Sequence, residues 1–174
     1  ITRSFLEKKY NQLVVLGGGF DHLATYYQQQ GIQCFEIDTP YMCQLKREFL
    51  RTHYPKNQHP EVVEGHFPSD NLQTLFNASN GIDPKKNTLI VAEGFFDYLD
   101  PQTVTTSLSA IRSYFVENQR IISTHFALDE LPTFYRSVFK SSVSMVGERL
   151  QFNTPMDQFE KLLAANDITI EHCY

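Results

Sequence analysis

The sequence predicts an α/β fold in which helices cover both faces of a mostly parallel, doubly wound sheet. Three observations support this prediction: short apolar runs recur along the chain, amphipathic stretches of helical length separate them, and glycine or proline marks most boundaries. Strands and helices that alternate in this way form a sheet through right-handed crossovers. We expect residues 1–174 to form a single domain, because no linker or internal repeat divides them.

Six apolar segments are predicted to be strands. Each is short and rich in branched or aromatic residues, as buried parallel strands are. They are residues 12–17 (QLVVLG), 32–38 (IQCFEID), 60–65 (PEVVEG), 87–94 (NTLIVAEG), 119–126 (QRIISTHF) and 168–174 (ITIEHCY). The first and the fourth give the clearest signal.

The stretches between these strands predict helices. They cover residues 20–30, 40–54, 69–78, 100–115, 128–140 and 154–167. Gly31 is placed to end the first helix, and Pro40 and Pro101 suit the first turn of theirs. Ser69 and Asp100 are candidate N-caps, because a short polar side chain there can accept a hydrogen bond from a free main-chain N–H.

Composition limits the classes of partner. The formal net charge is −5 with no basic stripe, which argues against nucleic acid. No apolar run approaches the roughly 20 residues that span a bilayer, and the opening ITRSFLEKKY does not resemble a secretory signal. Cys34, Cys43 and Cys173 show neither disulfide nor zinc spacing. We therefore expect reduced thiols, a cytoplasmic location and neither a nucleic-acid nor a membrane partner.

A turn of three glycines, Gly17 to Gly19, follows the first strand and is a candidate ligand-binding turn. Glycine lets a ligand approach the backbone closely, and in open α/β sheets ligands bind beyond the carboxyl ends of the strands. A dinucleotide fingerprint would place a glycine where His22 stands, and the charge of Asp21 would repel a phosphate. The pattern favours an adenosine ligand with a neutral or positive tail, or else a plain tight turn.

Acids at the end of the second strand support the adenosine hypothesis. Glu36 and Asp38 follow the glycines by about 20 residues, where a carboxylate accepts hydrogen bonds from ribose hydroxyls. The pattern does not choose between the two acids. S-adenosylmethionine is an adenosine ligand of the required kind, because its sulfonium and ammonium groups suit carboxylate neighbours.

The fourth strand ends in a second group of polar residues. Glu93 closes an apolar central strand, where an acid is costly unless it has a partner. Asp100 is most simply a helix cap, and Tyr98 either orients a substrate or packs under the loop. His125 ends the fifth strand and is a candidate general base for a hydroxyl acceptor, or a partly buried histidine without a catalytic role.

Two other groups of charged or metal-binding side chains have simpler interpretations. Lys46 and Arg47 on the second helix are expected on a solvated face. Three histidines lack metal-ligand spacing, so no metal is expected; they are His53, His59 and His66.

Three segments resemble the leucine carboxyl methyltransferase family of S-adenosylmethionine-dependent methyltransferases. LVVLGGGFDHL resembles the family's V-x-L-G-x-G-x-D-T, CFEIDTPYMCQLKREFL its F-E-x-D-x-P and following Lys-bearing helix, and TLIVAEGFFDYLDPQTV its x-x-A-E-G-x-x-x-Y-L. Their order and spacing also agree. The resemblance covers roughly residues 10 to 125 and implies a Rossmann-like methyltransferase fold with S-adenosylmethionine as cofactor.

The resemblance also assigns roles to individual residues. It places Gly17 and Gly19 against the methionine part of the cofactor, and Asp21, which matches the motif's acid, is a further cofactor-binding candidate. It favours Asp38 over Glu36 for the ribose hydroxyls, and it turns Glu93 toward the cofactor.

The chain departs from the family pattern in several places. His66 and Phe67 stand where members commonly have Asp-Leu near the adenine, and His22 replaces a threonine. The family's N-terminal helices and a final strand are missing from the sequence, so we expect a domain truncated at one or both ends.

We expect an O-methyltransferase that acts on a carboxylate or a hydroxyl of a small molecule or protein. A carboxylate acceptor is already ionised at neutral pH and needs no general base. Two alternatives remain: a weak or inactive domain that binds an adenosine ligand or a protein partner, and a nicotinamide-dependent oxidoreductase.

Overall fold

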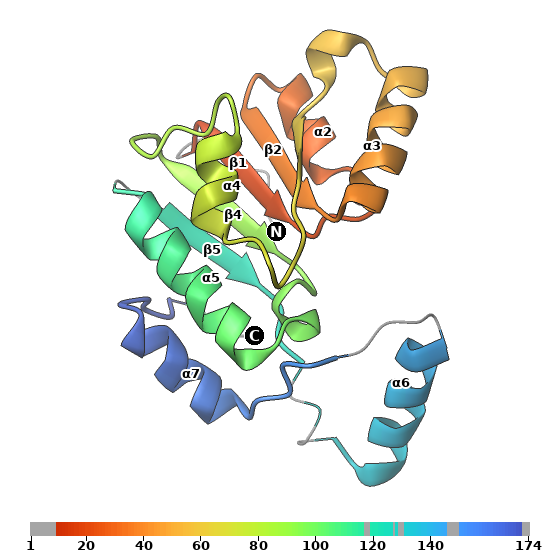
Figure 1. Cartoon of the computed structure of the whole chain (residues 1–174), viewed down its shortest axis with the longest axis vertical. Helices are drawn as coiled ribbons and strands as arrows, with labels where there is room; N and C mark the ends of the chain where they lie inside the picture. The colour runs from red at the N-terminus through yellow and green to blue at the C-terminus, as the bar shows by residue number, and fades with distance from the viewer. Residues whose placement is uncertain (1–9, 117–118, 127, 129–130, 146–149, 172–174) are drawn as a thin grey trace.

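Five parallel strands form a single sheet in the computed structural model, which describes residues 10–116, 119–126, 128, 131–145 and 150–171. Their order is β3-β2-β1-β4-β5 (Figure 1). The strands are β1 (Gln12–Leu16), β2 (Gln33–Asp38), β3 (Glu61–Glu64), β4 (Thr88–Ala92) and β5 (Gln119–Ser123). The first five predicted strands are therefore confirmed.

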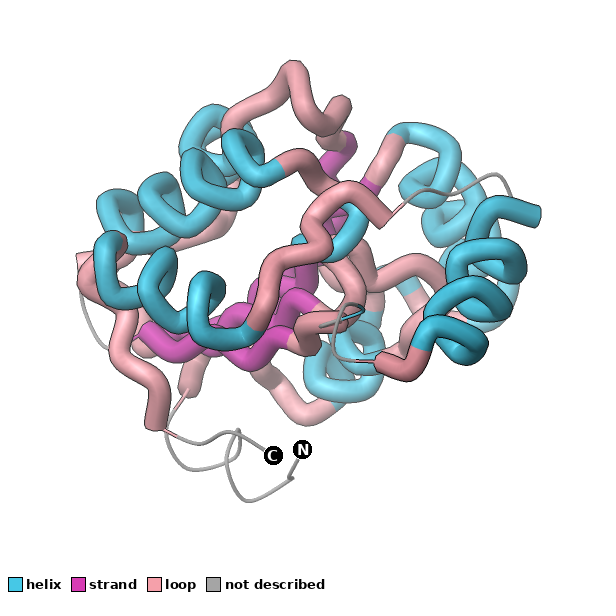
Figure 2. Tube along the Cα trace, turned by 90° about the horizontal axis from the view of Figure 1, so that it is seen from below, coloured by secondary structure: helices cyan, strands magenta, loops and turns pink. Residues whose placement is uncertain are grey.

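Helices cover both faces of this sheet, as expected from the alternating pattern. They are α2 (Leu23–Gln29), α3 (Pro40–His53), α4 (Leu72–Ala78), α5 (Pro101–Tyr114) and α7 (Met156–Ala165), with short 3-10 turns η1 (Lys56–Gln58) and η2 (Phe96–Tyr98). Helix α6 (Thr133–Met145) lies away from the sheet (Figure 1). Figure 1 shows α4 and α5 in front of the strands. Figure 2, which views the molecule from below, shows the strands between helices. The predicted doubly wound, Rossmann-like α/β fold is confirmed.

The central strand β1 is buried on both faces, and its alternating side chains divide the core in two. Val14 and Leu16 join the cluster that packs under α4, α5 and α7. Leu13 and Val15 join the cluster that packs under α2. This two-sided burial explains the unbroken apolar run of the strand. The strand order reverses between β1 and β4, so the loops after these strands border the crevice where such sheets bind ligands.

Before β5, the helices α2 and α4 each start three residues later than predicted. The first helix begins at Leu23 instead of residue 20, because the glycine turn occupies the preceding residues. Helix α4 is capped by Asn71, whose side chain accepts a hydrogen bond from the Gln73 N–H at 2.8 Å. Ser69 instead donates its hydroxyl to the His66 carbonyl oxygen, in the turn before the helix. Asp100 caps α5 as predicted.

The C-terminal part of the chain differs more. The helix predicted over residues 128–140 spans Thr133–Met145, following Pro132. The strand predicted over residues 168–174 is wrong for residues 168–171, which have no regular structure; residues 172–174, with Cys173, lie outside the described residues. An alternating apolar pattern becomes a strand only beside a hydrogen-bonding partner, and residues 168–171 pair with no described strand.

Lys46 was expected on a solvated face, and the structure contradicts this. Its ammonium group is buried, lies 3.1 Å from Glu36 Oε2 and donates to the main-chain oxygen of Asp21. The burial follows because α3 packs beside β2 and β3, and Lys46 lies on the packed side with Cys43 and Leu50.

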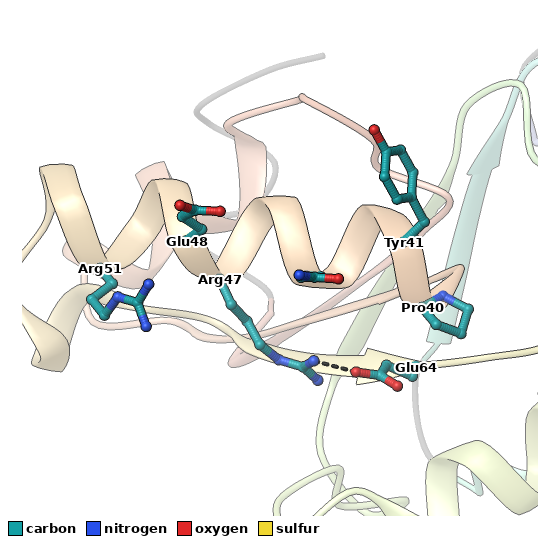
Figure 3. Close-up of a pocket in the computed structure, with 7 residues that line it drawn as sticks. Pro40, Tyr41, Arg47, Glu48, Arg51 and Glu64 are labelled. Carbon is teal, nitrogen blue, oxygen red and sulfur yellow. Dashed lines mark hydrogen bonds and ion pairs between the residues drawn. The ribbon is translucent and has the colours of Figure 1, made fainter.

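Arg47, the next residue, is exposed as expected. It pairs with Glu64 and donates to the Val62 carbonyl oxygen, across a surface groove between α3 and β3 (Figure 3). The groove is lined by Pro40, Tyr41, Gln44, Arg47, Glu48, Arg51 and Glu64. Arg47 thus occupies part of the open edge of β3, which limits pairing of that edge with other chains.

Replacing the observed cap of α4 should cost more stability than replacing the residue that the sequence suggested. We expect Asn71→Ala to lower the free energy of unfolding by about 1 kcal/mol, because the Gln73 N–H loses its acceptor. The matched variant Ser69→Ala should change it by less than about 0.5 kcal/mol. Urea denaturation of both variants measures the difference, and a larger effect of Ser69→Ala would contradict the assignment.

Removing the buried cation should leave Glu36 without a partner. We expect Lys46→Met to lower the free energy of unfolding by about 3 kcal/mol at pH 8, where Glu36 is ionised. The double variant Glu36→Leu/Lys46→Met should recover most of this loss, because it also removes the buried carboxylate. A double variant no more stable than the single one would show that the loss has another cause.

The stability of the fold should also depend on pH through Glu36. Burial raises the pKa of Glu36 from its ordinary value of 4.5 to about 7, although Lys46 acts in the opposite direction. A carboxyl whose pKa is higher in the folded state stabilises the fold fully below pH 4.5, and this contribution is lost as the pH rises through about 7. Urea denaturation should show that the free energy of unfolding of the parent chain is lower at pH 7.5 than at pH 5. The same difference should be smaller in Glu36→Gln. Equal differences would contradict the assignment.

Candidate cofactor site

The glycine turn after β1 combines a packing requirement with an open backbone. Gly17 and Gly19 have φ values of +64° and +51°, which favour glycine. A Cβ on Gly17 would lie 3.0 Å from the Phe95 ring, so this glycine lets the loop after β4 pack closely. A Cβ on Gly19 would meet nothing within 4 Å, so the backbone there is open to a ligand.

Asp38 lies beside this turn at the carboxyl end of β2. Its Oδ2 accepts a hydrogen bond from the Gly19 N–H at 2.8 Å, and its Oδ1 accepts one from the Thr39 N–H at 2.7 Å. Glu36 lies two residues nearer the middle of the strand, where it is buried against Lys46. The two candidate acids therefore differ in their position along β2, and of the two only Asp38, at the end of the strand, lies at the glycine turn.

Asp21 and His22 complete the turn. Asp21 Oδ1 accepts a hydrogen bond from the Leu23 N–H at 3.0 Å, at the start of α2. The His22 ring lies 5.3 Å from the Phe49 ring of α3, measured between centroids. A side chain thus fills the position where a dinucleotide fingerprint has glycine.

Glu93 is exposed, which corrects the expectation of a costly acid within the central strand. Strand β4 ends at Ala92, so Glu93 follows the strand in a loop at its carboxyl end. The Gly94 N–H donates to Thr124 Oγ1 at 2.7 Å, which connects the loops after β4 and β5. Tyr98 lies over this loop, since a Cβ on Gly94 would be 3.8 Å from its ring.

The loop after β3 brings His66 and Phe67 to the same edge of the sheet. The His66 N–H donates to Asp70 Oδ2 at 2.7 Å, and its side chain is exposed. The Phe67 ring packs edge to face on Phe95 at 5.2 Å, the same ring that packs on Gly17. The loops after β1, β3 and β4 are therefore in contact through one aromatic pair.

The side chain of His125 is buried and makes contacts with loops on the α7 side. Its Nε2 lies 2.6 Å from the Thr154 carbonyl oxygen and its Nδ1 lies 3.3 Å from Asp97 Oδ1. Its ring lies 4.5 Å from the Phe159 ring of α7, measured between centroids, at a tilt of 33°. The structure therefore places this side chain among packing contacts, which favours the non-catalytic interpretation that the sequence left open.

Sequence reasoning assigned no role to Asp97. Its carboxylate is fully buried, and Oδ1 accepts a hydrogen bond from the Phe126 N–H at 2.9 Å. Its main-chain oxygen accepts hydrogen bonds from the N–H groups of Gln151 and Phe152. Asp97 thus joins three segments around the carboxyl end of β4. The one signal for this role was an acid directly after two phenylalanines.

Other site classes find little support in the described ranges. No group of three or more potential metal ligands occurs there. None of the helices described is long and apolar enough to cross a membrane. Cys34 and Cys43 are free and buried, and burial raises the pKa of both thiols, that of Cys43 to about 11.

Solved structures of low sequence identity share this fold. An O-methyltransferase family protein from Burkholderia thailandensis matches with a TM-score of 0.65 at 11% identity, over 97% of this chain and 48% of that one. PigF with SAH matches with a TM-score of 0.65 at 16% identity, over 90% and 44%. Magnesium protoporphyrin IX methyltransferase (ChlM) from Synechocystis PCC 6803, with bound SAH, matches with a TM-score of 0.62 at 14% identity, over 92% and 64%.

This chain thus spans less than half the length of the first two of these structures. A search of curated protein sequences finds no match. The family model for leucine carboxyl methyltransferase, in contrast, matches residues 1–112, which include the glycine turn, Asp38 and the loop after β4. The chain therefore belongs to the leucine carboxyl methyltransferase family.

Proposed function

We propose that this chain binds S-adenosylmethionine at the carboxyl ends of β1, β2 and β4 and transfers its methyl group to an oxygen atom. The observation that carries the proposal is the pairing of the Asp38 carboxylate with the open Gly19 backbone at the point where the strand order reverses. Family membership and SAH in two structures of the same fold support this cofactor.

The residues at this edge suit the parts of such a cofactor. Asp38 would accept hydrogen bonds from the ribose hydroxyls, and the open backbone at Gly17 and Gly19 would lie along the methionine part. Glu93 and Asp21 would supply negative charge for its ammonium and sulfonium groups. His66 and Phe67 would border the adenine, with the Phe67 ring as an apolar surface. When bound, the cofactor supplies an electrophilic methyl group.

The acceptor is proposed to be a carboxylate or a hydroxyl. A carboxylate is ionised at neutral pH, so the chain has only to orient it and exclude water. A carboxylate acceptor needs no general base, and the ring nitrogens of His125, the candidate base, already lie against Thr154 and Asp97. Tyr98, over the loop after β4, is our candidate for orienting the acceptor through its hydroxyl group.

Cofactor binding should depend on Asp38 more than on a neighbouring acid. We expect isothermal titration calorimetry to detect binding of S-adenosylmethionine and SAH but not of NAD, because His22 fills the glycine position of the dinucleotide fingerprint. Asp38→Asn should weaken SAH binding about 10- to 100-fold, since it removes a charged hydrogen-bond acceptor. The matched control is Glu64→Gln. Glu64 lies opposite Asp38 in the register of β2 and β3, and its substitution should leave the affinity for SAH unchanged.

Two results would contradict the proposal. Binding of NAD alone would favour the oxidoreductase alternative. Binding of SAH without methyl transfer to any carboxylate or hydroxyl acceptor would favour a domain that binds an adenosine ligand without catalysis.

A further inference from the structure

Helix α6 carries an apolar stripe that faces solvent. Phe134, Tyr135 and Val138 are 73%, 64% and 53% exposed, and Leu131 precedes them at the matching spacing. Positions i, i+3, i+4 and i+7 lie on one face of a helix. An amphipathic helix normally buries such a face, so an exposed stripe of this kind indicates a binding surface.

Helix α6 lies at the end of the molecule toward which the strands point, and the candidate cofactor site lies at the same ends of the strands (Figure 1). In Figure 1 the strand arrows point toward the side on which α6 lies, and in both views α6 is well separated from α7. The Phe139 ring of α6 packs on Phe126 at 5.4 Å, and Phe126 follows β5 directly. Thr124, two residues earlier, accepts the hydrogen bond from the Gly94 N–H. A chain of contacts therefore connects α6 to the loop that carries Glu93.

Other exposed aromatic side chains follow the carboxyl ends of the strands. Phe20, in the glycine turn after β1, is 69% exposed, and Phe126, after β5, is also exposed. Both border the edge at which the cofactor is proposed to bind. Exposed aromatic side chains therefore occur both in the glycine turn and directly after β5, the strand that precedes α6 in the chain.

The charge of α6 also differs from that of the chain as a whole. Its sequence contains Arg136 and Lys140 and no acid, whereas the chain has a formal net charge of −5. These two basic residues would complement an acidic group on an apolar ligand of this helix. An aromatic ring fits best, because Phe and Tyr side chains bind rings through stacked and edge-to-face contacts.

We propose that the stripe of Leu131, Phe134, Tyr135 and Val138 binds the methyl acceptor, and that the acceptor is an aromatic molecule carrying a carboxylate or a phenol. This inference rests on the proposed function. The acceptor oxygen forms a bond to the methyl carbon while the methyl–sulfur bond breaks, with the electron pair left on sulfur. A carboxylate needs no proton transfer, and a phenol releases its proton to water.

Small aromatic acids test this inference with the whole 174-residue chain. The probes are 2-naphthoate and 2-naphthol, with cyclohexanecarboxylate and a hexapeptide ending in leucine as comparisons. Saturation-transfer NMR in the presence of SAH measures binding, and radiolabelled S-adenosylmethionine measures methyl transfer. We expect the two naphthalene probes to bind and to be methylated in preference to the comparison compounds.

Substitutions in the stripe provide the second part of the test. Phe134→Ser/Tyr135→Ser should weaken 2-naphthoate binding and raise its KM at least about tenfold, because two ring contacts are lost, and should leave SAH affinity unchanged. The control is Val116→Ser, which also replaces an exposed apolar side chain by serine, at a position after α5 that is 69% exposed. It should change neither quantity.

The outcomes separate the two proposals. Absence of SAH binding would overturn the proposed function and this inference with it. SAH binding with no naphthoate binding, or with preference for the leucine peptide or cyclohexanecarboxylate, would overturn the inference alone. Sedimentation that shows a dimer for the parent chain and a monomer for the double variant would also overturn it, because the stripe would then be an interface between two copies.

Discussion

The buried ammonium of Lys46 is the interaction on which the geometry of the candidate site depends. It pairs with Glu36 inside β2 and donates to the main-chain oxygen of Asp21 in the glycine turn. One side chain from α3 therefore fixes the end of β1 relative to the neighbouring strand. A buried charge is costly without such partners, so the arrangement has few alternatives of similar energy.

Further contacts connect the loops along the carboxyl edge of the sheet. Asp38 holds the Gly19 N–H, the ring of Phe95 packs on Gly17, and Thr124 holds the Gly94 N–H. Each contact joins loops that follow adjacent strands. Backbone groups held in this way need little rearrangement when a ligand binds, which reduces the entropic cost of binding.

The proposed cofactor surface and the proposed acceptor surface have different chemistry, which suits two different ligands. At the glycine turn the Asp38 carboxylate holds the open Gly19 backbone, and the exposed Glu93 follows the neighbouring strand β4, which suits an adenosine ligand with a positive tail. Beyond β5, two of the four side chains in the α6 stripe are aromatic, and both charged residues of the helix are basic. Contacts from Phe139 of α6 through Phe126 to Asp97 connect these two surfaces to the loop after β4.

Several features could be predicted from the sequence: the succession of strands and helices along the chain as far as β5, the glycine turn, the cap at Asp100 and the acids that follow the turn. These features depend on local patterns, such as the periodicity of apolar residues and the conformational freedom of glycine, and a short stretch of sequence is enough to predict them. Tertiary structure alone decided that Lys46 is buried, that Asp38 instead of Glu36 reaches Gly19, and that Glu93 is exposed. The same is true of residues 168–171, whose alternating pattern lacks a partner strand among the described residues. In each case the outcome depends on contacts between segments distant in the sequence, and a local pattern carries no information about those contacts.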